Sequence, residues 1–195
     1  MATTRHAGTS EWFREWSKPG LRVLYMANYS LGNAFFSGAF WNDHDAGDAI
    51  DTTPSRFPLK DISNRPTSMG LRTLTAVTNQ LAAGTYTDIH GYNDDMWDRP
   101  YYTDGTATVE IYGIPKDHIV DLVLGGKNFA ANDRGGTYKI TPDNRQPEVV
   151  QGDTGWSGPV MFRGIEPVSG SIQIQFDMVT NFCYWSFFDL RAYRR

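Results

Sequence analysis

Residues 169–177 read SGSIQIQFD, and this short stretch is the clearest indicator of the fold. Its apolar side chains Ile172, Ile174 and Phe176 alternate with the polar side chains Gln173, Gln175 and Asp177. Successive side chains of an extended chain point to opposite faces, so this alternation predicts a β-strand with one buried and one solvated face. A strand of that kind is typical of an antiparallel sheet that covers a core.

Similar stretches occur along most of the chain. They are residues 21–29, 70–78, 106–114, 117–126, 135–142, 158–165 and 182–193. Gly, Pro, Asn and Asp separate them, and helical periodicity is nearly absent. The chain has 195 residues, of which 40% are hydrophobic, and this is enough for one sizeable core. We therefore predict an all-β protein, an antiparallel β-sandwich or jelly roll, with a single domain over residues 21–195.

Residues 1–20 are predicted to form a short N-terminal arm that ends at Pro19-Gly20. Within it, residues 10–17 (SEWFREWS) favour one or two helical turns, because Trp12 and Trp16 are four positions apart and would share one helix face. The two rings have two interpretations. They cover the sandwich of their own chain, or they bind a neighbouring subunit.

The charge of the chain argues against nucleic acid as a ligand. The formal net charge is −4, and the one basic cluster is Arg191, Arg194 and Arg195 at the C-terminus. No apolar run has the length of a membrane span, so we expect no membrane insertion. The N-terminal residues lack the pattern of a signal peptide, so we expect synthesis in the cytoplasm without export by the usual route.

Cys183 is the single cysteine, and it lies in the aromatic run FCYWSFF. One cysteine cannot form a disulfide within the chain. Its neighbours indicate a buried thiol that fills space in the core, and the sequence shows no basic neighbour that would make it a nucleophile.

The order of the predicted strands resembles the galactose-binding-domain-like β-sandwich superfamily over most of residues 21–193. Its penultimate strand typically follows a P-x-x-G-x-I-x-I pattern, matched here by Pro167, Gly170, Ile172 and Ile174. The loop that contains Trp41-Asn42 also fits. Relatives often carry Gly-Tyr and then Asn in the closing strand, where this chain has YWSFFDL, so no ligand contact is carried over there. The resemblance implies a scaffold used by sugar-binding modules, adhesion modules and bacteriophage decoration or adaptor domains.

An acidic stretch, FWNDHDAGDAID at residues 40–51, raises the question of a metal site. Asp43, Asp45 and Asp48 begin like a calcium loop, but no Glu follows at the required offset. Two interpretations stay open: a structural Ca²⁺ ion held near these aspartates, and a solvated loop whose carboxylates bind their own backbone. No other cofactor is expected, because the histidines lack the paired spacing of a zinc site.

The sequence contains no complete catalytic motif. The nearest match to a serine-hydrolase elbow, residues 155–158, is followed by Pro159 where the second glycine belongs. Paired carboxylates for glycoside cleavage cannot be assigned from spacing alone. We expect a protein that is not an enzyme, and a carbohydrate-active or ester hydrolase is the third interpretation.

Residues 90–102 (HGYNDDMWDRPYY) are the best candidate for a binding surface. The candidate ligand-binding or partner-binding side chains are Tyr92, Asn93, Asp95, Trp97, Arg99, Tyr101 and Tyr102. Flat rings beside carboxylates and amides suit sugar recognition, and the same composition suits a protein interface. A loop that packs its own rings over the edge of the sandwich is the third interpretation.

Two functional classes follow from these observations. The first is a non-enzymatic structural protein, a bacteriophage virion component such as a capsid decoration, tail or adaptor protein. It would contact other virion proteins or copies of itself through its arm and aromatic loops. The second is a stand-alone, lectin-like module that binds a glycan, for example on a cell surface. The missing signal peptide favours the first class, because phage proteins leave the cell by lysis, and the expected location is then the virion.

Overall fold

The computed structural model describes residues 20–26, 35–36, 39–42, 53–80, 100–126, 135–142, 148–149 and 160–195. Every regular element in these ranges is a β-strand. They accordingly contain no helix that could span a membrane. Residues 1–19, with the predicted helical turns and with Trp12 and Trp16, lie outside the described part of the chain.

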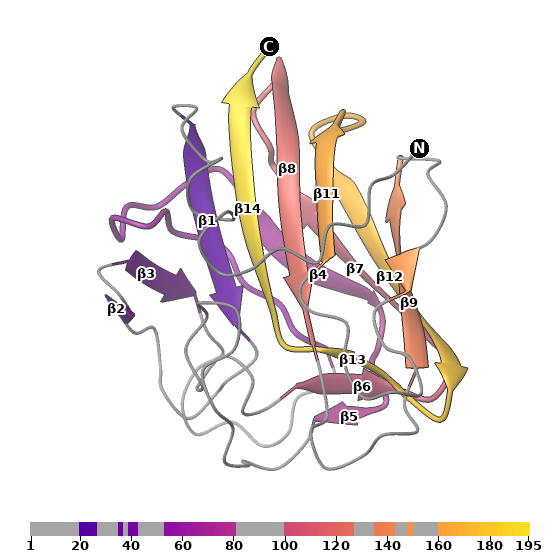
Figure 1. Ribbon diagram of the computed structural model, residues 1–195. Helices are drawn as coiled ribbons and strands as arrows, with labels where there is room; N and C mark the ends of the chain where they lie inside the picture. The colour runs from indigo at the N-terminus through magenta and orange to yellow at the C-terminus, as the bar shows by residue number, and fades with distance from the viewer. Residues whose placement is uncertain are drawn as a thin grey trace.

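The described strands form three open sheets (Figure 1). The six-stranded sheet has the order β11 (Val160–Ile165), β8 (His118–Gly125), β14 (Phe187–Arg194), β1 (Leu21–Met26), β3 (Ala39–Asn42) and β2 (Phe35–Phe36). The five-stranded sheet has the order β10 (Glu148–Val149), β9 (Gly135–Thr141), β12 (Ile172–Thr180), β7 (Thr106–Tyr112) and β4 (Gly70–Thr75). A small sheet contains β13 (Cys183–Trp185), β6 (Tyr101–Thr103) and β5 (Asn79–Gln80). Strands β1 and β3 pair in parallel and the other described pairs are antiparallel, which confirms the all-β, mainly antiparallel prediction.

The alternation predicted for residues 169–177 is confirmed in β12. Ile172 and Ile174 are fully buried and Phe176 is 2% exposed. The intervening Gln173, Gln175 and Asp177 are half-buried on the opposite face. Strand β12 lies between β7 and β9, so its buried face becomes the middle of the inner side of the five-stranded sheet.

The closing stretch, predicted as one strand over residues 182–193, is two strands in the structure. The break is at Ser186, whose backbone N–H donates to the carbonyl of Gly125 at 2.7 Å. Strand β13 pairs with β6 in the small sheet, whereas β14 pairs with β1 and β8 in the six-stranded sheet. The aromatic residues on the two sides of the break therefore belong to different sheets, which a continuous apolar run cannot reveal.

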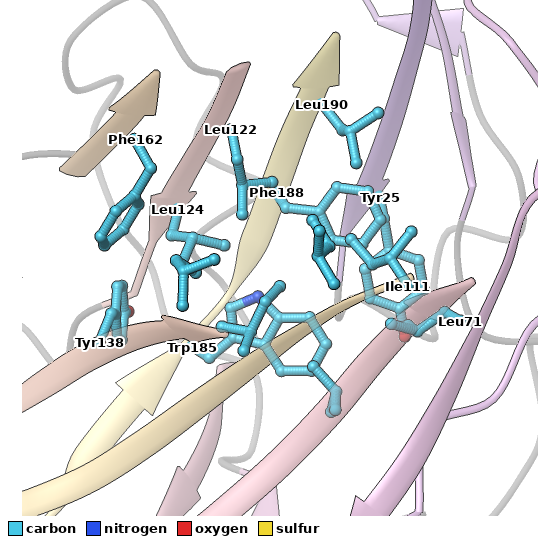
Figure 2. Packing of buried hydrophobic residues seen from close by; sticks show 14 of the residues in the cluster. Tyr25, Leu71, Ile111, Leu122, Leu124, Tyr138, Phe162, Trp185, Phe188 and Leu190 are labelled. Atoms are coloured by element: carbon cyan, nitrogen blue, oxygen red, sulfur yellow. The ribbon is translucent and has the colours of Figure 1, made fainter. Parts of the chain in front are cut away.

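Trp185, next to that break, lies at the centre of the core. It is 1% exposed. Its ring stacks on Phe176 of β12 at 5.0 Å between centroids, on Tyr101 of β6 at 5.5 Å and on Tyr25 of β1 at 5.6 Å. Figure 2 shows the indole among side chains from both large sheets. One side chain therefore contacts all three sheets.

Cys183 is buried, as predicted for an apolar filler, with 1% exposure. Its thiol packs so closely on Gly136 that a Cβ atom added there would lie 2.4 Å from Sγ. Burial raises the pKa of the Cys183 thiol well above its usual range. The thiol is therefore protonated at neutral pH, and a protonated thiol is a poor nucleophile.

The two large sheets differ in what their outer faces meet. On the six-stranded sheet, the side chains turned away from the shared core include Leu24, Met26, Val123 and Phe187, and each is at most 1% exposed. The outer face of the five-stranded sheet instead carries polar side chains, and all of them except the buried Glu110 are half-buried or exposed. Among the described residues, it is thus the more polar and the more exposed of the two outer faces.

A charged pair is also buried on the outer face of the six-stranded sheet. Arg22 donates from Nε to Oδ1 of Asp189 at 3.0 Å and from a terminal nitrogen to Oδ2 at 2.7 Å. Asp189 is 1% exposed, so its charge depends on this bidentate partner. The pair joins β1 to β14, the two central strands of that sheet.

We expect the substitution Trp185→Ala to lower the free energy of unfolding by roughly 3–5 kcal/mol, because it removes a buried indole and leaves a cavity. Urea unfolding followed by circular dichroism measures the change. The control is Val168→Ala, since Val168 is 61% exposed. A loss no larger than that of the control would contradict the central role of Trp185.

Candidate functional site

The solvated face of the five-stranded sheet presents an ordered array of polar and aromatic side chains, which we call the outer platform. Its members point outward from β4, β7, β12 and β9: Arg72, Thr108, Glu110, Tyr112, Gln173, Gln175, Asp177, Lys139 and Thr141. Cross-strand pairing sets their rows; for example, Arg72 lies opposite Glu110, which lies opposite Gln173. The platform thus follows directly from strand register.

Two aromatic rings form one corner of the outer platform. Phe57, which precedes β4 in the chain, stacks on Tyr112 of β7 with 6.1 Å between ring centroids and 17° between ring planes. Phe57 is 64% exposed, the largest value among the large apolar side chains of the described residues. The guanidinium of Arg72 lies 5.1 Å from the centre of the Tyr112 ring. We call these three side chains the aromatic corner.

Gly70 makes room for this corner. A Cβ atom added to Gly70 would lie 2.4 Å from Cζ of Tyr112 and 2.5 Å from its hydroxyl oxygen. Real Cβ atoms do not approach other atoms so closely, so the ring of Tyr112 lies against the backbone of β4 only because position 70 has no side chain.

Glu110 links the aromatic corner to the polar rows. Its Oε2 accepts a bond from Nε of Arg72 at 2.5 Å, and its Oε1 accepts a bond from the hydroxyl of Ser171 at 2.5 Å. Glu110 is 8% exposed, whereas the side chain of Arg72 is 57% exposed. The carboxylate is thus held in one orientation by fixed donors, while nitrogen atoms of Arg72 remain accessible to solvent.

The half of the outer platform farther from the aromatic corner, which contains Gln175, Asp177 and Lys139, also has internal hydrogen bonds. Asp177 accepts from the Thr106 hydroxyl at 2.7 Å and from Nε2 of Gln175 at 2.9 and 2.8 Å. Lys139 lies opposite Gln175 on β9 and is exposed. This half offers amide, hydroxyl and ammonium groups, with a carboxylate whose lone pairs are largely in use.

The segment that carries Phe57 is fixed to both large sheets. Arg56 and Leu71 exchange two backbone hydrogen bonds, of 2.9 and 2.8 Å, which attach the segment to β4. Ile62 donates its backbone N–H to the carbonyl of Arg22 on β1 at 3.1 Å. The exposed ring of Phe57 is therefore presented by a backbone with defined partners on either side.

Asp61 stabilises the turn within that segment. Burial alone would raise its pKa, but hydrogen bonds from the backbone N–H of Arg65, from the Arg65 side chain and from the backbone N–H of Ser63 outweigh this effect, and the pKa is lowered. The bonds measure 3.0, 2.9 and 2.9 Å respectively. The ionised carboxylate is thus part of the structure of this turn.

Two of the side chains predicted from residues 90–102 lie in the described part. Tyr101 is fully buried and its ring stacks on Trp185, so it belongs to the core and has no exposed surface for a ligand. Tyr102 is half-buried and packs against Phe182 at 5.0 Å between centroids. The remaining candidates of this segment, Tyr92, Asn93, Asp95, Trp97 and Arg99, lie outside the described residues.

The predicted metal ligands are not tested by the structure. Asp43, Asp45 and Asp48 lie outside the described ranges. Within those ranges, no three His, Cys, Asp or Glu side chains are grouped so that they could hold a metal ion.

Sequence reasoning missed the outer platform. The alternation of Gln173, Gln175 and Asp177 predicts a solvated face, but it does not indicate which residues from other strands share it. Phe57 and Tyr112 are 55 positions apart in the sequence, and no local pattern relates them. One local signal could have pointed to this face. In residues 70–78, Gly70, Arg72 and Leu74 occupy alternate positions, and a glycine within a strand often marks a close approach of another group.

Comparisons with known proteins identify the fold. No family model and no curated protein matches the chain. A β-glucuronidase from Bacteroides uniformis aligns with a TM-score of 0.52 and 10% identity over 89% of this chain and 18% of that one. A calcium-binding mutant of B. uniformis β-glucuronidase 2 aligns with a TM-score of 0.55 and 11% identity over 90% and 18%.

This chain thus spans less than a fifth of either β-glucuronidase, and at such identity the likeness concerns the fold alone. TmCBM61, solved in complex with β-1,4-galactotriose, aligns with a TM-score of 0.33 and 13% identity over 65% of this chain and 88% of that one. The alignments therefore show a fold that resembles part of each β-glucuronidase.

We expect Gly70→Ala to displace the Tyr112 ring with little loss of stability, because the clash is with the far end of a side chain that can turn away. The NMR signals of Phe57 and Arg72 should then shift, since both side chains contact that ring. Unchanged signals in a folded Gly70→Ala variant would show that Gly70 does not set the position of the ring.

The lowered pKa of Asp61 predicts a specific dependence of stability on pH. A carboxyl group whose pKa is lowered by folding stabilises the protein above its unfolded pKa of about 3.9, and this contribution disappears as the pH falls through the lower folded value. The loss of unfolding free energy below about pH 4 should therefore be smaller in Asp61→Asn than in the wild type. Asp117→Asn is the control, because Asp117 is exposed and Asn tolerates its φ of 63°. Equal pH profiles for wild type and Asp61→Asn would contradict this assignment.

Proposed function

We propose that this chain is a non-catalytic glycan-binding module that binds sugar on its outer platform, next to the aromatic corner. The observation that carries the proposal is the stack of Phe57 on Tyr112 beside the Arg72–Glu110–Ser171 hydrogen bonds, on a sheet face open to solvent. The ring of Phe57 is 64% exposed and lies on a tyrosine ring beside polar groups that are held by hydrogen bonds.

The aromatic corner and the polar side chains beside it each have a use in sugar recognition. A pyranose has an apolar face of C–H groups, which packs on a flat ring such as that of Phe57, and hydroxyl groups around its rim, which need donors and acceptors. Exposed nitrogen atoms of Arg72 donate, and the amide of Gln173 both donates and accepts. Glu110 and Ser171 are fixed by each other, so little conformational entropy is lost at these two groups on binding.

The fold comparisons favour a glycan over a virion partner. The two structures described above that align with a TM-score over 0.5 are named as β-glucuronidases, proteins that act on a sugar, and this chain is similar to a fraction of each. The resemblance of the sequence to galactose-binding-like domains also favours a glycan as the ligand. The interpretation as a virion component has no support among the described residues or the comparisons, so we place it second.

The carboxylates of the outer platform favour binding over hydrolysis. Asp177 lies opposite Thr106, four positions along β7 from Glu110. Four residues of a strand span about 13 Å, so these two carboxylates are farther apart than the roughly 5–9.5 Å that separates the catalytic pair of a glycosidase. Each is also engaged by neighbouring donors.

We expect Phe57→Ala and Tyr112→Ala each to weaken binding to a polysaccharide by about tenfold or more, which corresponds to about 1.4 kcal/mol. Affinity electrophoresis in gels that contain a panel of soluble polysaccharides identifies the ligand, and isothermal titration measures the loss. Val168→Ala is the matched control, as an exposed apolar side chain that is not part of the platform.

A second variant tests the alternative site. Trp97→Ala should leave the affinity unchanged if sugar binds on the outer platform, whereas a loss in Trp97→Ala alone would move the site to residues 90–102. A wild-type protein that no polysaccharide retards would end the proposal.

A further inference from the structure

We further infer, on the basis of the proposed function, that the ligand is an uncharged stretch inside a polysaccharide chain, which lies across β4, β7, β12 and β9. The inference excludes two alternatives at the same site. One is an acidic glycan that carries uronate or sulfate groups, and the other is a single sugar at a chain end.

The charges of the outer platform argue for an uncharged ligand. Arg72 and Lys139 contribute two positive charges, and Glu110 and Asp177 contribute two negative charges. Arg72 is already paired with Glu110 and lies over the ring of Tyr112. An anionic ligand needs cations that converge and are free to pair with it. Lys139 is one exposed cation on β9, at the opposite side of the platform from Arg72, so the platform does not provide such a cluster.

The shape of the outer platform indicates that it binds an internal stretch of a polysaccharide chain. One row runs across four strands, from Arg72 through Glu110 and Gln173 to Thr141, as the register shows. Strands lie about 4.8 Å apart, so this row is about 14 Å long and extends past a single sugar ring.

The row is exposed to solvent at both ends, at Arg72 and at Thr141. The segment that pairs with β4 through Arg56 and Leu71 places Ser55 beside Arg72, and Ser55 is exposed as well. Beyond β9, strand β10 pairs at Thr137 and Tyr138, away from Thr141, and so does not extend the row. Side chains of the platform stand on a pleated sheet surface, with donors and acceptors spread along the row. A chain that continues in both directions fits this surface, whereas a terminal sugar would use only part of it.

The test measures how the intact protein binds ligands that differ in charge and in length. The probes are neutral polysaccharides (a β-glucan, a galactan and a mannan) and acidic ones (polygalacturonate and heparin), followed by an oligosaccharide series from the polymer that binds. We expect retention by a neutral polymer that persists at about 1 M NaCl, where the Debye length is about 3 Å. Affinity should rise at least tenfold from the monosaccharide to the trisaccharide and then level off.

Two variants locate the chain on the platform. Gln173→Ala, in the middle of the row, should weaken binding of the trisaccharide more than binding of the monosaccharide. Lys116→Met, which changes an exposed lysine outside the platform, should leave binding of the neutral polymer unchanged and is the control. Lys139→Met removes the exposed cation of β9 and tests whether the ligand is acidic.

The outcomes separate this inference from the proposed function. Retention only by acidic polymers, lost at high salt and in Lys139→Met, would overturn the inference and leave glycan binding in place. So would a monosaccharide that binds as tightly as the trisaccharide while Phe57→Ala and Tyr112→Ala still weaken binding. Retention by neither class of polymer would overturn both.

Discussion

The stacking of aromatic rings around Trp185 is the interaction on which the rest of the structure depends. Its neighbours Phe176, Tyr101 and Tyr25 come from three different sheets, so the indole fixes the distance and the angle between layers that share few backbone hydrogen bonds. Large aromatic side chains bury more apolar surface than aliphatic ones, and a sandwich of short strands gains much of its stability there. The break at Ser186 is what places Trp185 between the layers, because it lets the chain leave the small sheet and enter the six-stranded one.

The outer faces of the two large sheets differ in burial and polarity. The six-stranded sheet is buried on both sides along its central strands, and on its outer side the buried carboxylate of Asp189 is paired with Arg22. The five-stranded sheet is apolar inside and polar outside, so it can present side chains to a ligand without losing its packing. The structure thus separates the part that holds the fold from the part that is free to bind, and substitutions on the outer platform are expected to act on binding more than on stability.

The outer platform requires no catalytic chemistry to be useful. Its two carboxylates are separated along β7 and engaged by neighbouring hydroxyl, amide and guanidinium groups. What it provides is geometry: an exposed ring held by a segment with backbone bonds to both sheets, and rows of donors and acceptors at strand spacing. The proposed recognition of a polymer uses these rows, which repeat at strand spacing.

Local patterns in the sequence were sufficient to predict the fold class, most strand positions and the buried state of Cys183. The alternation in residues 169–177 is visible within nine positions and requires no knowledge of neighbours. Local patterns did not indicate that the closing aromatic run divides at Ser186, that the ring of Tyr101 is in the core, or that Phe57 meets Tyr112. Those depend on which strands pair and in which register, and on the absence of a side chain at Gly70. Only the tertiary structure decided them, because contacts between residues far apart in the chain are selected by the packing of the whole core, and no short segment records them.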